Sequence, residues 1–287
     1  MLFSTTMQTN IRLKHFLFLC RPLNVIIGML SIFIGAFITG TLQPLLKVIL
    51  ASISGGLIAA GANVINDYFD VKIDKINKPH RPIAAGLVTP REGFVYSLLL
   101  FWSGIIVGWL VNWLAFVISV FSATLLFFYS YKLKRTVLWG NISVSLMTAL
   151  AFIYGGVAVN RISFSLIPAA FSFFYHLGRE IIKDVEDIAG DQADRIKTLP
   201  IVHGEKIALQ TATGIYLFLI VLTIMPYFFK IFGIYYLAAV VLIVDLIIVY
   251  VLISMWRNSA SKNLSRLSLI LKLNMFAGLL AIYVGKF

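Results

Sequence analysis

Residues 94–131 read FVYSLLLFWSGIIVGWLVNWLAFVISVFSATLLFFYSY and contain no Asp, Glu, Lys or Arg. About 20 consecutive apolar residues are enough for one helix to cross the hydrocarbon core of a bilayer. This stretch is long enough for two such helices. We therefore predict two membrane-spanning helices here, at 94–111 and 113–131.

Similar apolar runs recur along the chain. Of its 287 residues 60% are hydrophobic and only 13% are charged, which is more apolar surface than a soluble domain of this length can hide. We predict an all-α polytopic membrane protein, a single domain over residues 1–287 with nine transmembrane helices around a central cavity. The other seven helices are expected at about 22–40, 46–66, 138–158, 163–183, 207–229, 232–256 and 268–285.

The basic residues indicate the orientation in the membrane. The net charge of +12 is compatible with nucleic-acid binding, but its distribution argues for topology instead. If the N-terminus is cytoplasmic, nearly all of the 24 Lys and Arg residues lie at the cytoplasmic helix ends and loops, as the positive-inside rule requires. The exceptions are Lys47, Arg161, Lys230 and Lys286. No nucleic-acid partner is expected.

The acidic residues are few and unevenly placed. Of twelve, four lie between Asp67 and Glu92 and seven between Glu180 and Glu205, and only Asp245 stands apart. Within the two groups one spacing repeats, D-x-x-D-x-x-x-D, in NDYFDVKID at 66–74 and in DVEDIAGD at 184–191. Residues i, i+3 and i+7 share one face of a helix. Each set is thus expected to project three carboxylates from the cytoplasmic end of a membrane helix.

Carboxylates crowded in this way predict a bound cation, because like charges repel unless a cation lies among them. Mg²⁺ typically takes one or two protein carboxylates and completes its shell with water and substrate phosphate. Two facing clusters would bind a diphosphate through such metals, although two solvated helix ends are the simpler alternative. The predicted catalytic metal ligands are Asp67, Asp70, Asp74, Asp184, Asp187 and Asp191.

These motifs resemble those of the UbiA superfamily of intramembrane prenyltransferases. The resemblance rests on N-D-x-x-D-x-x-x-D at 66–74 and on D-x-x-x-D at 187–191, and it extends to Arg21-Pro22 and to Tyr129-Ser130-x-x-x-Lys134-Arg135. It implies a Mg²⁺-dependent enzyme of the cell membrane, built from two pseudo-repeat halves, that transfers a prenyl group from a prenyl diphosphate at the cytoplasmic side. The residues it implies for substrate binding are Arg21, Asn66, Lys78, Arg81, Tyr129, Lys134, Arg135, Lys183 and Arg195.

Two longer blocks bear on the acceptor. N-x-P-x-R-P-I at 77–83 and the stretch 178–191 are most similar to the members that alkylate geranylgeranylglyceryl phosphate with geranylgeranyl diphosphate in ether-lipid synthesis. The phosphate of this lipid-like acceptor is expected in the basic cytoplasmic rim, at Lys132, Lys134, Arg135 and Arg195. The alternatives are an aromatic acceptor, such as 4-hydroxybenzoate or another quinone precursor, and a chlorophyllide-type acceptor. A cation transporter is a distant alternative, because it would need acids at the bilayer midplane. No role follows for His176 or Asp245.

Overall fold

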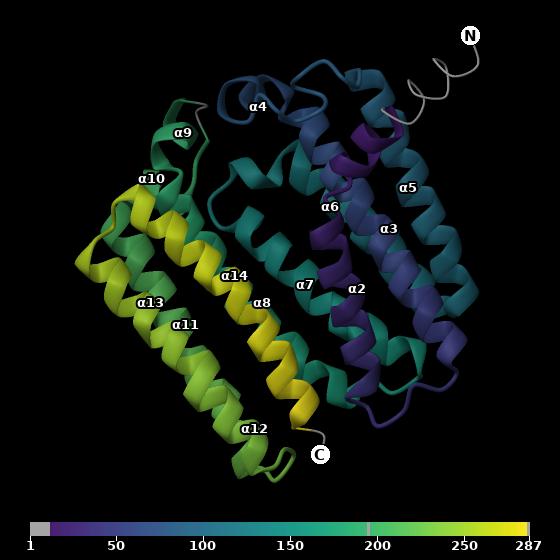
Figure 1. Cartoon of the computed structure of the whole chain (residues 1–287), viewed down its shortest axis with the longest axis vertical. Coiled ribbons are helices and arrows are strands. Elements are labelled where there is room, and N and C mark those ends of the chain that lie inside the picture. The colour runs from purple at the N-terminus through teal and green to yellow at the C-terminus, as the bar shows by residue number, and fades with distance from the viewer. Residues whose placement is uncertain (1–11, 194–195, 286–287) are drawn as a thin grey trace.

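The computed structural model describes residues 12–193 and 196–285, and within these ranges the chain is helical with no strand. The helices form one bundle (Figure 1). A helix over Arg12–Leu19 precedes the labelled elements. These are α2 (Pro22–Phe37), α3 (Leu45–Phe69), α4 (Val71–Asn77), α5 (Pro90–Val111), α6 (Trp113–Tyr131), η1 (Leu133–Arg135), α7 (Trp139–Ala158), η2 (Ser163–Ser165), α8 (Leu166–Glu186), α9 (Ile188–Ala193), α10 (Leu199–His203), α11 (Glu205–Phe228), α12 (Ile234–Ala239), η3 (Val240–Asp245), α13 (Leu246–Arg257) and α14 (Ser261–Val284).

The charge-free run 94–131 forms α5 and α6, as predicted, and Asn112 separates them. Its side-chain oxygen accepts a hydrogen bond from the Ala115 N–H at 2.8 Å, which caps α6. Its amide donates to the Val157 carbonyl at 2.9 Å and so ties the turn to α7. The single amide side chain in the run therefore lies between the two helices and caps the second.

The chain bends sharply at Arg21. The helix Arg12–Leu19 and α2 meet at 49°, and Arg21 between them has a positive φ of 50°. A proline disfavours the helical conformation for the residue before it, so Pro22 explains why the helix cannot continue through Arg21. The bend turns the Arg21 side chain toward the end of α3.

Seven helices of the described chain are long and apolar enough to cross a membrane, or eight if the bent pair counts as one span. They are α3, α5, α6, α7, α11, the continuous stretch Ile234–Arg257 and α14. Helix α8 packs in the same bundle against α7, α11 and α14, but it carries Arg179, Glu180 and Lys183. The predicted count of nine spans and the side of the N-terminus therefore stay predictions.

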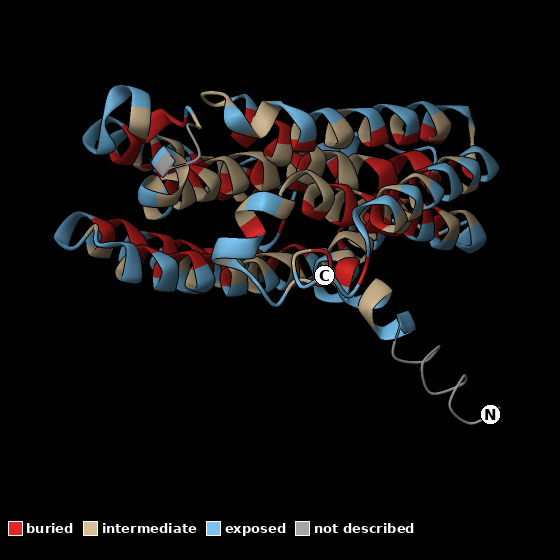
Figure 2. Cartoon of the chain, turned by 90° about the horizontal axis from the view of Figure 1, so that it is seen from above, coloured by how far each residue is buried: buried red, intermediate tan, exposed pale blue. Residues whose placement is uncertain are grey.

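The outer surface of the bundle is the surface of a membrane protein. Figure 2 shows exposed residues along the outside of the bundle and buried residues gathered between its helices. Large apolar side chains lie exposed there, among them Trp102 at 64%, Trp109 at 68% and Trp113 at 72%. Soluble monomers rarely expose contiguous apolar surface of this extent. The chain is an integral multi-pass membrane protein.

Helices α2 and α7 approach so closely that two glycines are required. A Cβ at Gly35 would lie 2.1 Å from the Phe152 carbonyl oxygen, and one at Gly155 would lie 1.9 Å from the Ile32 carbonyl oxygen. Both contacts are with backbone, which cannot rotate away. Small residues of this kind let membrane helices pack backbone to backbone, and here they join the helix after Arg21 to the helix before α8.

We expect Gly155→Ala to destabilise the protein by about 3 kcal/mol, the upper end of the usual cost of overpacking. The matched control is Gly28→Ala on α2, where a Cβ meets nothing within 4 Å. Unfolding of the two variants in detergent, followed by circular dichroism, gives the comparison. Equal stability of both variants would show that the close approach of α2 and α7 does not limit stability.

Candidate active site

The two aspartate motifs share one local backbone arrangement. Helix α3 ends before Asp70 and α8 ends before Asp187, and these middle aspartates have nearly the same dihedral angles, φ −93° and ψ 3° against φ −97° and ψ 8°. A short helix, α4 or α9, then begins. The N–H of the third aspartate donates to the carbonyl of the middle one, at 2.8 Å for Asp74 and 2.9 Å for Asp191.

The prediction that each motif lies on one unbroken helix is therefore wrong. Both middle aspartates have left the α region for the neighbouring bridge region of the Ramachandran map. The third aspartate of each motif lies on a separate short helix, Asp74 on α4 and Asp191 on α9, and not on the long helix that carries the first aspartate. Figure 1 shows α4 and α9 at the same end of the bundle.

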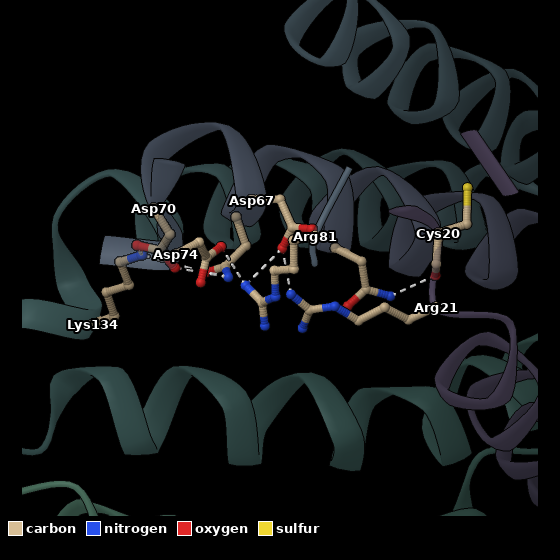
Figure 3. Close-up of polar contacts among 9 residues, drawn as sticks. Cys20, Arg21, Asp67, Asp70, Asp74, Arg81 and Lys134 are labelled. Atoms are coloured by element: carbon tan, nitrogen blue, oxygen red, sulfur yellow. Dashed lines mark hydrogen bonds and ion pairs between the residues drawn. The ribbon is translucent and has the colours of Figure 1, made fainter. Parts of the chain in front are cut away.

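In the first motif the outer aspartates converge on one arginine (Figure 3). Nη1 of Arg81 donates to Asp67 Oδ1 at 3.0 Å and to Asp74 Oδ2 at 2.6 Å. Nη2 of Arg21 reaches the same Asp67 oxygen at 2.5 Å. Both aspartates are buried, with 3% of the surface of Asp67 and 4% of the surface of Asp74 exposed. Buried charges persist only when they are paired, and these two are held by guanidinium groups.

The middle aspartate of the first motif is paired with a lysine from the segment after α6. Nζ of Lys134 forms an ion pair with Asp70 Oδ1 and lies 3.4 Å from Asn66 Oδ1. The Asn66 amide donates to the other Asp70 oxygen at 2.9 Å. Burial lowers the pKa of Lys134, and the adjacent Asp70 opposes this change. Three carboxylates of the first motif are thus matched by three cations.

The second motif is not balanced in this way. Asp184 accepts a hydrogen bond at 2.8 Å from the neutral amide of Asn141 on α7. Asp187 is exposed, and its side chain forms no hydrogen bond or ion pair with another described residue. Glu180 forms ion pairs with both nearby cations of α8, with Arg179 at 2.9 Å and with Lys183 at 3.2 Å. Asp184 and Asp187 of the second motif therefore form no ion pair with a described cation.

Electrostatic contacts join the two motifs into one site. The negative charges of Asp70 and Asp184 both act on Tyr129, near the end of α6. Burial, and then the positive charge of Arg81, lower the pKa of Lys78, and Lys183 of the second motif adds to this effect. Such effects decline steeply with distance, so Tyr129 and Lys78 each lie within electrostatic range of residues at both motifs.

The carboxylates suit a metal that is shared with a substrate. Among residues 12–193 and 196–285, no three Asp, Glu, His or Cys side chains converge as a closed metal cage. Mg²⁺ does not need one, since it binds through one or two carboxylates plus substrate phosphates. Oδ2 of Asp67, Oδ1 of Asp74 and Oδ1 of Asp184 accept no hydrogen bond from the described residues. These oxygens are available to a cation.

Most of the predicted substrate-binding residues lie at this site. Arg21, Asn66, Arg81 and Lys134 surround the first motif, Lys183 belongs to the second, and Tyr129 lies between them. The side chain of Arg135 is exposed and contacts no carboxylate in the described chain, although its carbonyl accepts the Lys197 N–H at 3.3 Å. Arg195 lies outside the described residues.

Two contributors were not predicted from the sequence. Asn141 positions Asp184, and Glu180 pairs with both Arg179 and Lys183. An amide in the otherwise apolar run 138–158 is a signal that could have identified Asn141, because polar side chains in membrane helices usually face the bundle interior. Glu180 carries no such signal apart from its closeness to the second motif.

An apolar cavity lies between α2, α8, α11, α12 and α14. It holds about 690 Å³ of empty space, its open side included. His176 and Tyr175 line it from α8, Ile27 from α2, and Asn274 and Met275 from α14. Buried Asp245 has a different environment: it accepts from the Thr223 hydroxyl at 3.3 Å and so links η3 to α11.

Comparisons with known proteins agree on one family. A sequence profile described as the UbiA prenyltransferase family matches residues 13–278. A digeranylgeranylglyceryl phosphate synthase of Methanosphaera stadtmanae is 32% identical over 92% of this chain and 96% of its own length. The protein of the same name from Methanobrevibacter smithii is 38% identical over 93% of this chain and 96% of its own length.

Solved structures show the same fold. A structure described as giving structural and mechanistic insights into digeranylgeranylglyceryl phosphate synthase in membranes matches with a TM-score of 0.81 and 34% identity, over 96% of this chain and 98% of that chain. A UbiA homologue from Archaeoglobus fulgidus, bound to GPP and Mg²⁺, matches with a TM-score of 0.67 and 19% identity, over 94% of this chain and 100% of that one. At this lower identity the likeness concerns the fold alone.

Proposed function

Because this chain belongs to the UbiA prenyltransferase family, we propose that it transfers a geranylgeranyl group from geranylgeranyl diphosphate to geranylgeranylglyceryl phosphate in ether-lipid synthesis. The observation that carries the proposal is the similarity, over more than nine-tenths of the chain, to synthases named for the product of this transfer. The site is proposed to face the cytoplasm from the cell membrane and to use Mg²⁺.

The donor's diphosphate is assigned to the space between the two motifs. Mg²⁺, held there by Asp67, Asp70 and Asp74 and by Asp184, Asp187 and Asp191, would stabilise the negative charge of the leaving diphosphate. Arg81, Arg21 and Lys134 already lie at the carboxylates, so they can donate charge-assisted hydrogen bonds to diphosphate oxygens. The negative charge left over at Asp184 and Asp187 attracts the cation to the second motif.

Formation of the ether bond does not require a strong general base. The allylic C–O bond of the donor breaks, and the acceptor hydroxyl forms the new ether bond to the resulting carbocation and releases its proton. An alcohol is a weak nucleophile, but it adds readily to a carbocation. The described residues therefore do their work by binding both substrates, orienting them and neutralising charge.

The chain offers little support for ion transport. A transport pathway would need several acids along the bilayer midplane. In the described part of the chain, Asp245 alone among the acids lies in the middle of a membrane-length helix, Ile234–Arg257, and its hydrogen bond to Thr223 gives it a structural role.

Purified protein in detergent tests the proposal. With Mg²⁺ and geranylgeranyl diphosphate, we expect a two-chain ether phosphate to form from geranylgeranylglyceryl phosphate, at about 100-fold greater kcat/KM than any product from 4-hydroxybenzoate. Mass spectrometry identifies each product, and Asp187→Ala serves as the inactive control. Efficient prenylation of 4-hydroxybenzoate without use of the ether phosphate would assign a different acceptor within the same family.

A further inference from the structure

Lys272 is a cation near the middle of α14 (Ser261–Val284), which is a membrane-length helix. The only hydrogen bond of its side chain within the described chain is from Nζ to Asn24 Oδ1 on α2, at 3.2 Å, and no described carboxylate forms an ion pair with it. Charged residues inside membrane spans are costly, and those that persist usually have a function.

The neighbours of Lys272 increase this positive charge. Nε of Arg179 on α8 donates to the carbonyl of Ser268 at 3.3 Å, one turn before Lys272 on the same face of α14. The charges of Arg179, Lys183 and Arg21 all act on Lys272, and all are positive. The one nearby acid, Glu180, is already shared by Arg179 and Lys183. The three cations Arg179, Lys183 and Lys272 therefore share one carboxylate, and Lys272 has no ion-pair partner among the described residues.

This cationic group adjoins the apolar cavity. Tyr175 and His176 line the cavity and lie one turn from Arg179 on α8. Asn274 and Met275 line it and follow Lys272 on α14. The Tyr175 hydroxyl donates to the Leu271 carbonyl at 2.7 Å and holds the two helices together at this point. A net positive charge beside an apolar cavity matches a ligand with an anionic head and an apolar chain.

We propose that Lys272 and Arg179, with Asn24, bind the phosphate of the acceptor lipid. The inference rests on the proposed function, in which both substrates carry phosphate and each needs its own cations. Arg21, Arg81 and Lys134 already pair with the first motif, where the donor is assigned. The sequence predicts that Lys134 and the exposed Arg135 bind the acceptor phosphate. We assign this role instead to Arg179 of α8 and Lys272 of α14.

The test compares Lys272→Met with Lys262→Met, which removes the same charge from the exposed start of α14. KM is measured separately for acceptor and donor. The Kd of geranylgeranylglyceryl phosphate is measured without donor and with a chelator present, by thermophoresis of the detergent-purified protein.

For Lys272→Met we expect the acceptor KM and the acceptor Kd both to rise about tenfold or more, because a charge-assisted contact is lost. The donor KM should stay within about twofold of the wild-type value. Lys272→Arg and Lys262→Met should bind as the wild type does.

Unchanged acceptor constants in Lys272→Met, or an equal rise in the donor KM, would overturn the proposal. So would an equal loss of affinity for geranylgeranylglycerol, which has no phosphate. Thermal unfolding identifies any variant that is simply misfolded, and Lys272→Gln then replaces Lys272→Met. If the wild type binds the ether phosphate but does not prenylate it, the proposed function fails, while the Kd comparison still decides the role of Lys272.

Discussion

Turnover is expected to fall by about 1,000-fold or more when either Asp70 or Asp187 is replaced by alanine. Each is the middle aspartate of its motif and lies at the break between a long helix and a short one. Removing one carboxylate takes away a ligand for the cation that stabilises the leaving diphosphate. Product formation at saturating Mg²⁺ and donor, followed by mass spectrometry, measures the loss.

The two variants should differ in stability. Asp70→Ala leaves Lys134 without its carboxylate partner, and Lys134 is mostly buried, so some loss of stability is expected. Asp187 forms no ion pair with the described residues, so Asp187→Ala should unfold as the wild type does and is the cleaner test. Glu205→Ala, at the exposed start of α11, is the control for loss of one acid. Near wild-type turnover by both aspartate variants would remove the motifs from the mechanism.

The helices were predictable because hydrophobicity alone determines them. A charge-free run such as 94–131 has no stable place in water, so it must form membrane-length helices. The position of its break was predictable to within a residue, since Asn112 interrupts the run and can cap the next helix. Helix α8 was also predicted, although the charged residues of its C-terminal half distinguish it from the apolar spans.

The break inside each motif was not predictable. D-x-x-D-x-x-x-D is also the pattern of one helical face, and local periodicity cannot reveal that the chain turns at the middle aspartate. The partners of the carboxylates were only partly predictable. Arg81 was expected to contact a diphosphate, but that it bridges Asp67 and Asp74 depends on how the loop after α4 folds back over α3.

The surroundings of Lys272 were also not predictable from the sequence. The sequence predicts the last span at 268–285, so the positive-inside rule counts Lys272 with the charges at its end, whereas α14 begins at Ser261 and Lys272 lies near its middle. That count does not show that Lys272 lies beside Arg179 of α8 and Asn24 of α2, because three segments far apart in the sequence meet there. The positions of basic residues along the sequence predict how the chain is oriented in the membrane. Which charges pair with one another can be seen only in the packed helix bundle.

Chelation of divalent cations is expected to stop turnover by the wild type, by about 1,000-fold or more, and to leave its fold intact. The fold should survive because Arg81, Arg21 and Lys134 neutralise the first motif without a metal. Arg81→Met should change this behaviour. It leaves the buried Asp74 carboxylate without its ion-pair partner, whereas Asp67 keeps Arg21, and one unpaired buried charge costs about 3–5 kcal/mol.

The stability of Arg81→Met should therefore depend on Mg²⁺, while that of the wild type should not. A cation that binds only the folded state at 100 times its Kd stabilises it by about 2.7 kcal/mol, which would recover most of the loss. Unfolding in detergent with chelator and with saturating Mg²⁺ measures both effects. Arg91→Met, at the exposed start of α5, is the matched control and should respond to neither. If chelation destabilised the wild type as much as Arg81→Met, the cation would be part of the folded core and Arg81 would not be its substitute.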